Sequence, residues 1–534
     1  MKSRRGQRGS LMVLTSIALP VFLAPLVGLG IDGTVCYIVQ TELSAAVDGA
    51  ALGTGRLLST NANATDIANE FLNANFRVGQ GGFWGSYNLT SNVTVSTGTT
   101  KTVTVSASAT VPLIFLRIIH QNSATVSATA TATRRDARIE LVIDRSGSMN
   151  TSDGAGSTVI ADLVQYAQGF TQQFTEGYDE LGLVVFSGSA VVGYPTSPWP
   201  ASISPTGLGG PNNTFQDGSA TDMVNQIAKV KAGGGTAMGE ALALAYIELQ
   251  KAHMRDLQAN GADTRTNAIV LFTDGVPSSV PTYLNRNSNS AISSGSGCLY
   301  ATDTATPTNP MYGYVVQGSG GGNPPYTSSW GLYQLASLDT NAAHTSAWYM
   351  ANPSGDYVAP VPTTPEKSCN TSGWNPLSNL SKIPSFDKYG YSLGPNGNGY
   401  KISAIVNNPN LTSIYNGTAF STTNPTSAYQ WGLASWNDAD NVAEAIRSDA
   451  NYANRPGDTG GPMSITIYTV GYTGNGGTDY GLLQKLANVQ GCSVNGFSCY
   501  KNTQPSGIYV QASDKTALAN AFSVIATAIL RLAR

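Results

Sequence analysis

Three oxygen-bearing side chains follow one apolar run in the middle of the chain. The run Leu141–Ile143 ends in Asp144, and Ser146 and Ser148 follow at intervals of two residues. Aliphatic residues of this kind belong in a buried strand, whereas a carboxylate with flanking hydroxyl groups needs water, a proton or a cation. A core strand that ends in such a cluster is therefore a candidate cation site.

Two later segments place oxygens in the same kind of position. In AGGGTAMGEAL, Thr236 lies on a glycine-rich loop before an expected helix, and in NAIVLFTDG an apolar strand (268–272) ends in Thr273 and Asp274. The segments alternate as strand, helix, strand, helix, strand, which is typical of a parallel sheet covered on both faces. Ligands of such sheets bind beyond the carboxyl ends of the strands. We expect five residues to meet there: Asp144, Ser146, Ser148, Thr236 and Asp274.

Two carboxylates and three hydroxyl groups form an all-oxygen set that suits a hard cation. Magnesium is the predicted ion, or another divalent cation, because it accepts few protein ligands, keeps several waters and leaves a position open. An acidic side chain of a protein partner is the expected ligand at that position. The three histidines, His120, His253 and His344, lie away from these motifs, and no nucleophile elbow, HExxH or P-loop is present. We therefore expect binding and not catalysis.

The three segments resemble the von Willebrand factor A domain and its metal-ion-dependent adhesion site. DRSGS, the threonine of GGGTAMGEAL and the aspartate of FTDG match that family's motif segments in order. The resemblance implies a Rossmann-like, doubly wound α/β fold over residues 136–534. It also implies that Ser146, Ser148 and Thr236 approach the metal directly. The carboxylates of Asp144 and Asp274 would then act directly or through water.

A long polar stretch, about residues 276–436, interrupts this expected domain. It is rich in Gly, Ser, Asn, Pro and Tyr and precedes an expected helix at Asn441–Ser448 and a strand at Ser464–Tyr472. Because a structureless loop of that length is unusual, we predict an inserted lobe or a partly ordered excursion. It either shapes partner choice beside the site or is simply a tolerated insertion.

The beginning of the chain has the pattern of a membrane anchor. Four basic residues precede Leu11–Ile31, which carries no charge and is long enough to span a bilayer as a helix, and Asp32 follows it. This asymmetry predicts a single-pass protein of the bacterial inner membrane with a cytoplasmic N-terminus, residues 1–35 being tail and anchor. The bulk would lie in the periplasm or at the cell surface. A cleaved signal peptide is the alternative.

Two further parts are expected between the anchor and the site. Residues 36–76 are helix-forming and Ala-rich, as in exported pilin-like helices, and residues 77–135 alternate Val or Ala with Thr and Ser, as in a small β-rich spacer domain. Within the spacer, the apolar segment PLIFLRII starts with Pro112 at an expected helix start. The basic start, the span and LSAAVDGAALGTG resemble the N-terminal segment of TadG-like proteins of tight-adherence (Flp) pilus assembly. Because Leu14 stands where a type IV prepilin carries Glu, cleavage by a prepilin peptidase is not expected.

Composition limits the possible function classes and the possible disulfides. The net charge is −3 with 11% charged residues, so the basic surface of a nucleic-acid-binding protein is missing. Cys492 and Cys499 are close enough in sequence to form a small disulfide, and Cys298 and Cys369 could form a second, with five free thiols as the alternative. Cys36 is left over.

Three function classes remain: a membrane-anchored pilus-assembly component that binds a protein through the metal site, a metal-dependent surface adhesin not tied to a pilus machine, and, least favoured, a metal-dependent hydrolase.

Overall fold

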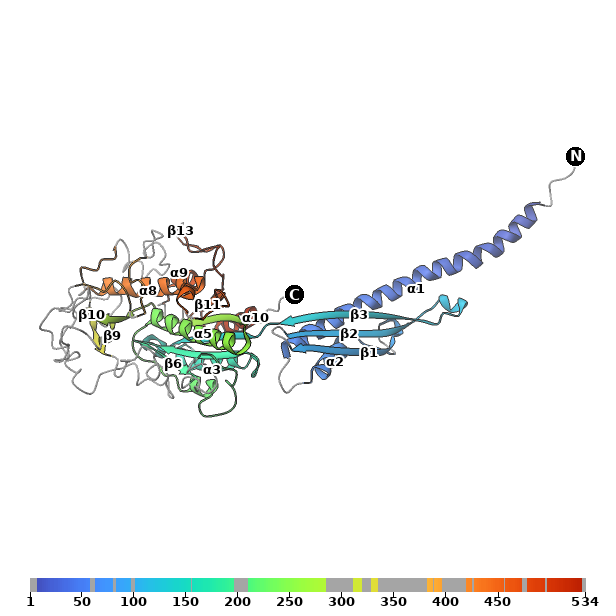
Figure 1. The fold of residues 1–534 in the computed structure, drawn as a ribbon. Coiled ribbons are helices and arrows are strands. Elements are labelled where there is room, and N and C mark those ends of the chain that lie inside the picture. The colour runs from blue at the N-terminus through green and yellow to red at the C-terminus, as the bar shows by residue number, and fades with distance from the viewer. Residues whose placement is uncertain are drawn as a thin grey trace. The chain divides into compact units, whose positions relative to one another are not determined.

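The chain divides into two compact units. Unit 1 comprises residues 1–135 and 530–534, and unit 2 comprises residues 136–529 (Figure 1). A computed structural model describes residues 7–57, 63–79, 83–97, 101–154, 156–195, 210–284, 311–318, 328–334, 382–387, 389–395, 419–424, 427–455, 457–472, 478–494 and 497–530.

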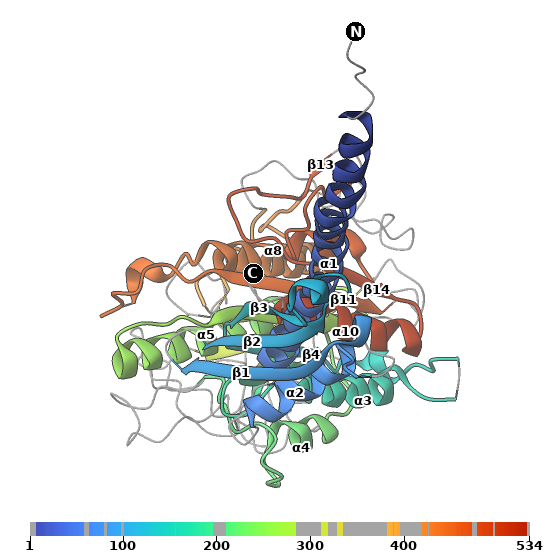
Figure 2. The same cartoon turned by 90° about the vertical axis from the view of Figure 1, so that its right-hand side faces the viewer.

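Unit 1 packs two helices against a three-stranded antiparallel sheet, whose strands Figure 2 shows side by side. Its elements are α1 (Gln7–Leu57), α2 (Ala64–Asn75), the single turn η1 (Phe83–Gly85), β1 (Tyr87–Thr97), β2 (Lys101–Pro112), the single turn η2 (Leu116–Ile119) and β3 (Ser123–Arg134). The sheet order is β1–β2–β3. The Asn63 side chain caps α2 by accepting a hydrogen bond from the backbone N–H of Thr65.

The period-two pattern of β2 builds the core of unit 1. Alternate side chains such as Val103 and Val105 are fully buried and pack with apolar residues of α1, including Val39 and Leu43. The helix predicted at 36–76 and the spacer predicted at 77–135 thus share one core. The boundary expected between residues 35 and 36 falls inside the continuous helix α1.

Two sequence-based expectations for unit 1 concern the membrane anchor in α1 and a helix starting at Pro112. Among the residues that the structure describes, no helix is long and apolar enough to cross a membrane. The backbone of α1 runs through the expected span Leu11–Ile31, but most side chains of that span lie outside the described residues, so the anchor stays a prediction. Pro112 does not start a helix: it is the last residue of β2, and η2 begins four residues later at Leu116.

Unit 2 is built on a six-stranded sheet in the order β14–β11–β7–β4–β5–β6. The strands are β4 (Ala137–Asp144), β5 (Glu180–Phe186), β6 (Ala190–Tyr194), β7 (Thr266–Thr273), β11 (Ile465–Tyr472) and β14 (Tyr509–Ala512). All neighbours pair in parallel except β5 and β6. The predicted α/β fold is confirmed. The edge strand β6 departs from a wholly parallel sheet because the three residues 187–189 are too few for a parallel crossover.

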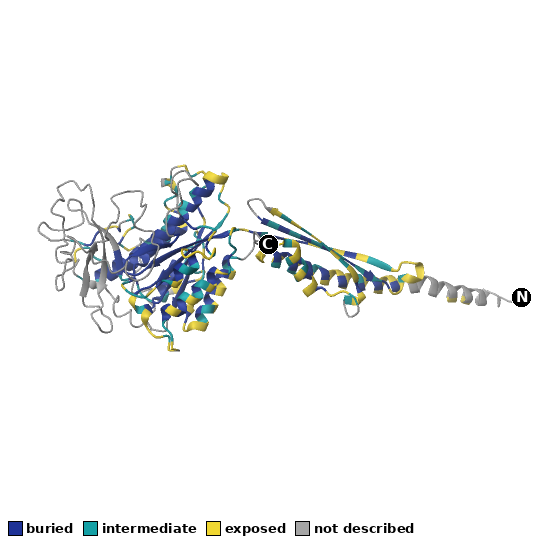
Figure 3. Ribbon diagram, turned by 90° about the horizontal axis from the view of Figure 1, so that it is seen from below, coloured by how far each residue is buried: buried dark blue, intermediate teal, exposed yellow. Residues whose placement is uncertain are grey.

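Helices cover both faces of this sheet (Figure 1). They are α3 (Val159–Thr171), α4 (Met223–Ala228), α5 (Met238–Asn260), α8 (Ala428–Ser448), α9 (Tyr480–Leu486) and α10 (Lys515–Ile529), with the short turns η3 (Gly147–Asn150) and η8 (Tyr452–Asn454). Helices α5, α8 and α9 share a core with one face. On the other face Phe522 of α10 lies against Phe170 of α3 and Phe272 of β7, with ring centroids 5.4 and 6.4 Å apart. Figure 3 shows the sheet as buried between these layers.

The range predicted as an insertion, 276–436, contains ordered elements. Strands β8 (Ser279–Leu284), β9 (Met311–Gly318) and β10 (Ser328–Gln334) form an antiparallel sheet in the order β10–β9–β8. Helix α8 begins at Ala428, inside the predicted range, so that boundary was wrong. Trp431 and Trp436 are buried, but so are their polar neighbours Asn437 and Asp438, and this mixture hides the helical pattern.

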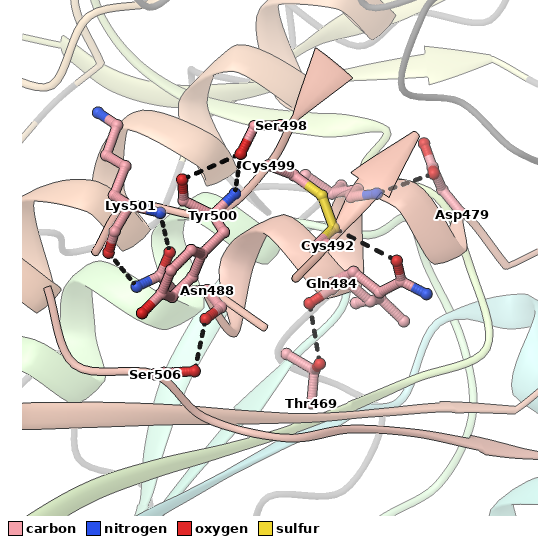
Figure 4. Close-up of a disulfide and its surroundings, with 12 residues drawn as sticks. Thr469, Asp479, Gln484, Asn488, Cys492, Ser498, Cys499, Tyr500, Lys501 and Ser506 are labelled. Carbon is pink, nitrogen blue, oxygen red and sulfur yellow. Dashed lines mark hydrogen bonds between the residues drawn. A yellow bond between two sulfur atoms is a disulfide. The ribbon is translucent and has the colours of Figure 1, made fainter. Parts of the chain in front are cut away.

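A disulfide joins Cys492 and Cys499, the pair expected from their spacing, with Cα atoms 5.3 Å apart (Figure 4). The two-residue strands β12 (Ser493–Val494) and β13 (Phe497–Ser498) lie between the two cysteines. Cys36 is a free, half-buried thiol. The second expected pair, Cys298 and Cys369, lies outside the described residues.

Candidate metal centre

The candidate site lies where β4 and β7 end, in the middle of the parallel sheet. The chain leaves β4 toward β5 on one side, and β7 lies on the other side. Such a reversal of strand order opens a crevice at the carboxyl edge. Asp144 is the last residue of β4, and Asp274 follows the last residue of β7. The fold therefore brings together two carboxylates that are 130 positions apart in sequence (274 − 144).

Hydrogen bonds connect the predicted site residues directly. The hydroxyls of Ser146 and Ser148 are 2.9 Å apart, and Ser148 Oγ donates to Oδ1 of Asp274 at 2.7 Å. Oδ1 of Asp144 accepts a hydrogen bond from the backbone N–H of Ser146 at 2.7 Å. The first and third segments thus form one connected cluster of oxygens.

Thr236 joins the same cluster from the glycine-rich loop. A Cβ placed on Gly275 would lie 3.4 Å from Thr236 Oγ1, 3.7 Å from Ser148 Oγ and 3.9 Å from Asp144 Oδ2. Three oxygens, one from the glycine-rich loop and two from the first motif segment, therefore surround one small space, which a side chain at Gly275 of the third segment would narrow. All five predicted residues lie at this edge of the sheet.

The electrostatics of the cluster favour a cation. Asp144 is fully buried and Asp274 is buried beside it. Burial, together with the charge of Asp274, raises the pKa of Asp144 to about 7, although hydrogen bonds from Thr273 and Ser146 oppose the rise. Two buried carboxylates that repel each other are stabilised when a divalent ion or a proton neutralises them.

The loop before Thr236 is held against the first motif. The Arg145 side chain is buried and its Nε donates a hydrogen bond to the carbonyl of Lys231, while Gly233 N donates to the carbonyl of Arg145. Gly147 N donates to the carbonyl of Gly234 at 2.9 Å. These hydrogen bonds hold the glycine-rich loop at a fixed position next to the carboxyl ends of the strands.

Gly234 is a position where only glycine fits. Its φ is +90°, and a Cβ there would lie 2.4 Å from Oγ of Ser187, which follows β5. Ala237 N also donates to the carbonyl of Ser187. The close approach that places Thr236 in the site therefore depends on this glycine.

Sequence reasoning did not assign a role to Thr273 or Arg145. Thr273 is fully buried, and its hydroxyl donates to Oδ2 of Asp144 at 2.5 Å, so it orients one carboxylate from the neighbouring strand. A hydroxyl residue immediately before Asp274 is a signal that could have suggested this. Arg145 stands between two motif residues, and nothing local indicates that a charged side chain there is buried.

The residues present fit a small hard cation. Asp144, Ser146, Ser148, Thr236 and Asp274 would hold it, and the ion would supply an electrophilic position for an acidic ligand. In the described part of the chain, no group of three or more His, Cys, Asp or Glu could hold a metal. The fit at this site rests instead on two carboxylates combined with hydroxyl groups.

The segment that contains these oxygens matches a known family model. Residues 139–276 match the model of the von Willebrand factor type A domain. The match includes all five predicted site residues and ends where the predicted insertion begins. No curated protein matches the chain.

Several solved structures are similar to this chain at low identity. The vWF domain of the type V pili tip protein Mfa5 from Porphyromonas gingivalis is 14% identical, with 74% of this chain and 95% of that chain covered and a TM-score of 0.29. The pilus adhesin SpaC from Lactobacillus rhamnosus GG, in an open conformation, is 11% identical over 84% of this chain and 35% of that chain, with a TM-score of 0.30. A von Willebrand factor type A protein from Catenulispora acidiphila is 18% identical over 35% and 34%, with a TM-score of 0.20. Similarity this weak says nothing about what this chain binds.

Proposed function

We propose that this chain is a membrane-anchored, exported protein that binds a protein partner through a divalent cation, magnesium by preference, held in the A domain. The observation that carries the proposal is the convergence of Thr236, Ser148 and Asp144 on one small space beside Asp274. Hydroxyl groups and carboxylates alone form a site that holds a cation and leaves it electrophilic. An Asp or Glu of the partner is then the complementary ligand.

A binding role agrees with the surroundings of the site. The described histidine of unit 2, His253, lies between Asp263 and Asp458, with its ring nitrogens 2.7 and 3.2 Å from their carboxylates. It is part of an ion-pair network with Arg138 and not of the oxygen cluster. The one histidine described in unit 2 is therefore not available to the oxygen cluster as a base, and we propose that the site holds a ligand and does not hydrolyse one.

We place the protein in tight-adherence pilus assembly, with the inner membrane as its location and a pilus or secretion-system component as its partner. The support is the N-terminal sequence: a basic start, an uncharged span and an Ala-rich helix that continues as α1 into unit 1. The alternative, a free surface adhesin, shares the metal site and differs only in the partner.

The test is capture of partners by the full chain, purified in mild detergent, from a cell-envelope extract with Mg²⁺ or with chelator. We expect capture that needs Mg²⁺ and is lost in Asp144→Ala and Thr236→Ala. Ser152→Ala is the matched control, because it removes an exposed hydroxyl four residues after Ser148. Captured pilus proteins would support assembly, and captured surface molecules of other cells would support adhesion. Capture that ignores metal and both substitutions would overturn the proposal.

A further inference from the structure

One end of unit 1 exposes a concentration of large apolar side chains. We call it the apolar tip. It consists of Leu26, Val27, Leu29 and Ile31 of α1 and of Ile114, Phe115, Ile118 and Ile119 in the β2–β3 connection. These are eight of the 18 exposed large apolar residues among those described, although they come from only two short segments. In Figure 3 the end of the sheet beside α1 is coloured as exposed.

The β2–β3 connection is fixed to α1 at Asp32. The Asp32 carboxylate is 1% exposed and accepts hydrogen bonds from the backbone N–H groups of Ile114, Phe115 and Leu116, at 3.0, 3.0 and 2.8 Å. Burial opposes ionisation, but these bonds and the charge of Arg117 lower the pKa of Asp32 below its usual value. The carboxylate therefore stays charged and keeps η2 against the helix.

Phe115 makes a second contact with α1, about one helical turn before Asp32, at Gly28. A Cβ on Gly28 would lie 2.4 Å from the Phe115 Cβ, so the absence of a side chain at Gly28 lets the connection touch the helix. Ile118 and Ile119 remain 69% and 54% exposed. The hydrogen bonds hold these apolar side chains beside α1 while leaving them uncovered.

The position of the Gly28–Phe115 contact along α1 indicates that lipid covers the apolar tip. The uncharged segment Leu11–Ile31 ends one residue before Asp32. Gly28 precedes that end by three residues, which is about 5 Å along a helix. Side chains packed at Gly28 therefore lie at the depth to which interfacial apolar groups enter a bilayer, about 5–10 Å. The apolar surface of the tip is continuous with the end of the expected span.

We propose that the apolar tip inserts into the surface of the outer leaflet of a phospholipid bilayer, so that unit 1 touches the membrane at two places. This rests on the proposed anchor. Arg117 lies within η2, between the exposed apolar residues, where its charge can reach anionic lipid headgroups while its stem covers apolar surface. The second contact stops unit 1 from swinging about α1 and fixes the direction in which it leaves the membrane.

The experiment uses the full chain in liposomes of phosphatidylcholine and phosphatidylglycerol. An environment-sensitive fluorophore is attached at Ile118→Cys in a Cys36→Ser background, with signal from the labelled background subtracted. Ser96→Cys is the matched control: Ser96 is an exposed residue of β1 and pairs with Thr102 near the start of β2, at the end of the sheet opposite the β2–β3 connection. Lipids with spin labels at the depth of the headgroup and upper acyl chain act as quenchers.

We expect a probe at Ile118→Cys to shift to the blue and lose most of its emission to the spin-labelled lipids, and a probe at Ser96→Cys to do neither. Liposome flotation is measured on the same samples. Protein that floats while both probes respond alike would overturn the tip contact and leave the anchor standing. Protein that does not float would overturn both. Disulfide-linked dimers of the unlabelled Ile118→Cys protein, with no quenching of the labelled protein by lipid, would assign the tip to a second copy and overturn lipid contact.

Discussion

Ser148 Oγ donates a 2.7 Å hydrogen bond to Oδ1 of Asp274, joining the first motif after β4 to the end of β7. The bond links residues 126 positions apart and holds the two sides of the oxygen cluster together. Its donor and its acceptor are both among the groups that would hold a cation. The same two atoms therefore hold the cluster together and, on the proposed function, would contribute to its affinity for the cation.

Ser148→Ala should weaken Mg²⁺ binding without unfolding unit 2. The substitution removes one oxygen of the cluster and leaves Asp274 without this hydrogen bond, at a net cost of about 1.5–3 kcal/mol for a charge-assisted bond. Isothermal titration with Mg²⁺ measures the affinity, and Ser152→Ala serves as the control. Equal affinities for Ser148→Ala and wild type would remove Ser148 from the site.

Asp144→Asn should stabilise the metal-free protein while it abolishes the response to Mg²⁺. Asp144 is fully buried next to Asp274, so neutralising it relieves carboxylate repulsion and the burial of a charge. The amide retains an acceptor for the backbone N–H of Ser146. We expect a higher melting temperature than wild type in chelator and no rise on adding Mg²⁺. A lower melting temperature in chelator would contradict this account of the site.

Thr273→Val should lower Mg²⁺ affinity about 10- to 100-fold, as loss of a supporting hydrogen bond to a metal ligand typically does. Valine matches the shape of threonine in a strand but cannot donate to Oδ2 of Asp144. Thr273→Ser, which keeps the hydroxyl, should restore most of the affinity. If serine and valine behave alike, the hydroxyl has no role in orienting Asp144.

Gly234→Ala should disturb the site more than Gly218→Ala does. Both glycines have positive φ, +90° and +77°, so each alanine carries roughly 1–2 kcal/mol of backbone strain. At Gly218 nothing lies within 4 Å of a new Cβ, whereas at Gly234 the Cβ would meet Ser187. Chemical denaturation and Mg²⁺ titration of both variants should show an additional loss of stability and of affinity for Gly234→Ala alone.

Asp438→Asn should remove part of the pH dependence of folding stability. Asp438 of α8 is fully buried, and the acidic residues Asp387 and Glu240 lie close to it. Burial, with the charges of Asp387 and Glu240, raises its pKa well above the usual value. Because the folded pKa is the higher one, this group stabilises the protein at low pH, and the stabilisation is lost as pH rises toward the folded pKa, by about 1.4 kcal/mol per unit.

Unfolding free energies at pH 6 and pH 8 check this. Wild type should lose stability between the two values, and Asp438→Asn should lose less, since asparagine imitates the protonated acid. Asp217→Asn is a suitable control, because its exposed carboxyl has a pKa lowered by Ser219 and is fully ionised over this range. Equal changes in the free energy of unfolding between pH 6 and pH 8 in all three proteins would show that Asp438 is already charged at pH 6.

The sequence alone predicted the α/β class and the residues of the oxygen cluster, because short apolar runs followed by Asp mark strand ends and strand ends share an edge. Helix α8 was not predicted at its true start, because its buried face mixes Trp436 with Asn437 and Asp438. The bonds from Ile114, Phe115 and Leu116 to Asp32 could not be predicted either. They join positions at least 82 residues apart, and the aspartate has the same local pattern whether it is solvated or buried.

Strands β7 and β11 pair in register, Asn267 opposite Ile465, although 198 positions separate them (465 − 267). A crossover of roughly 25 residues would suffice for neighbouring parallel strands, so the actual connection is longer by about three doublings. Each doubling of a flexible loop raises the entropy of closure by about 0.6 kcal/mol, or about 2 kcal/mol in all. The ordered strands β8–β10 inside the connection reduce this entropic cost further. The sheet can therefore accommodate large changes in the length of this segment, next to the candidate site, with little thermodynamic penalty.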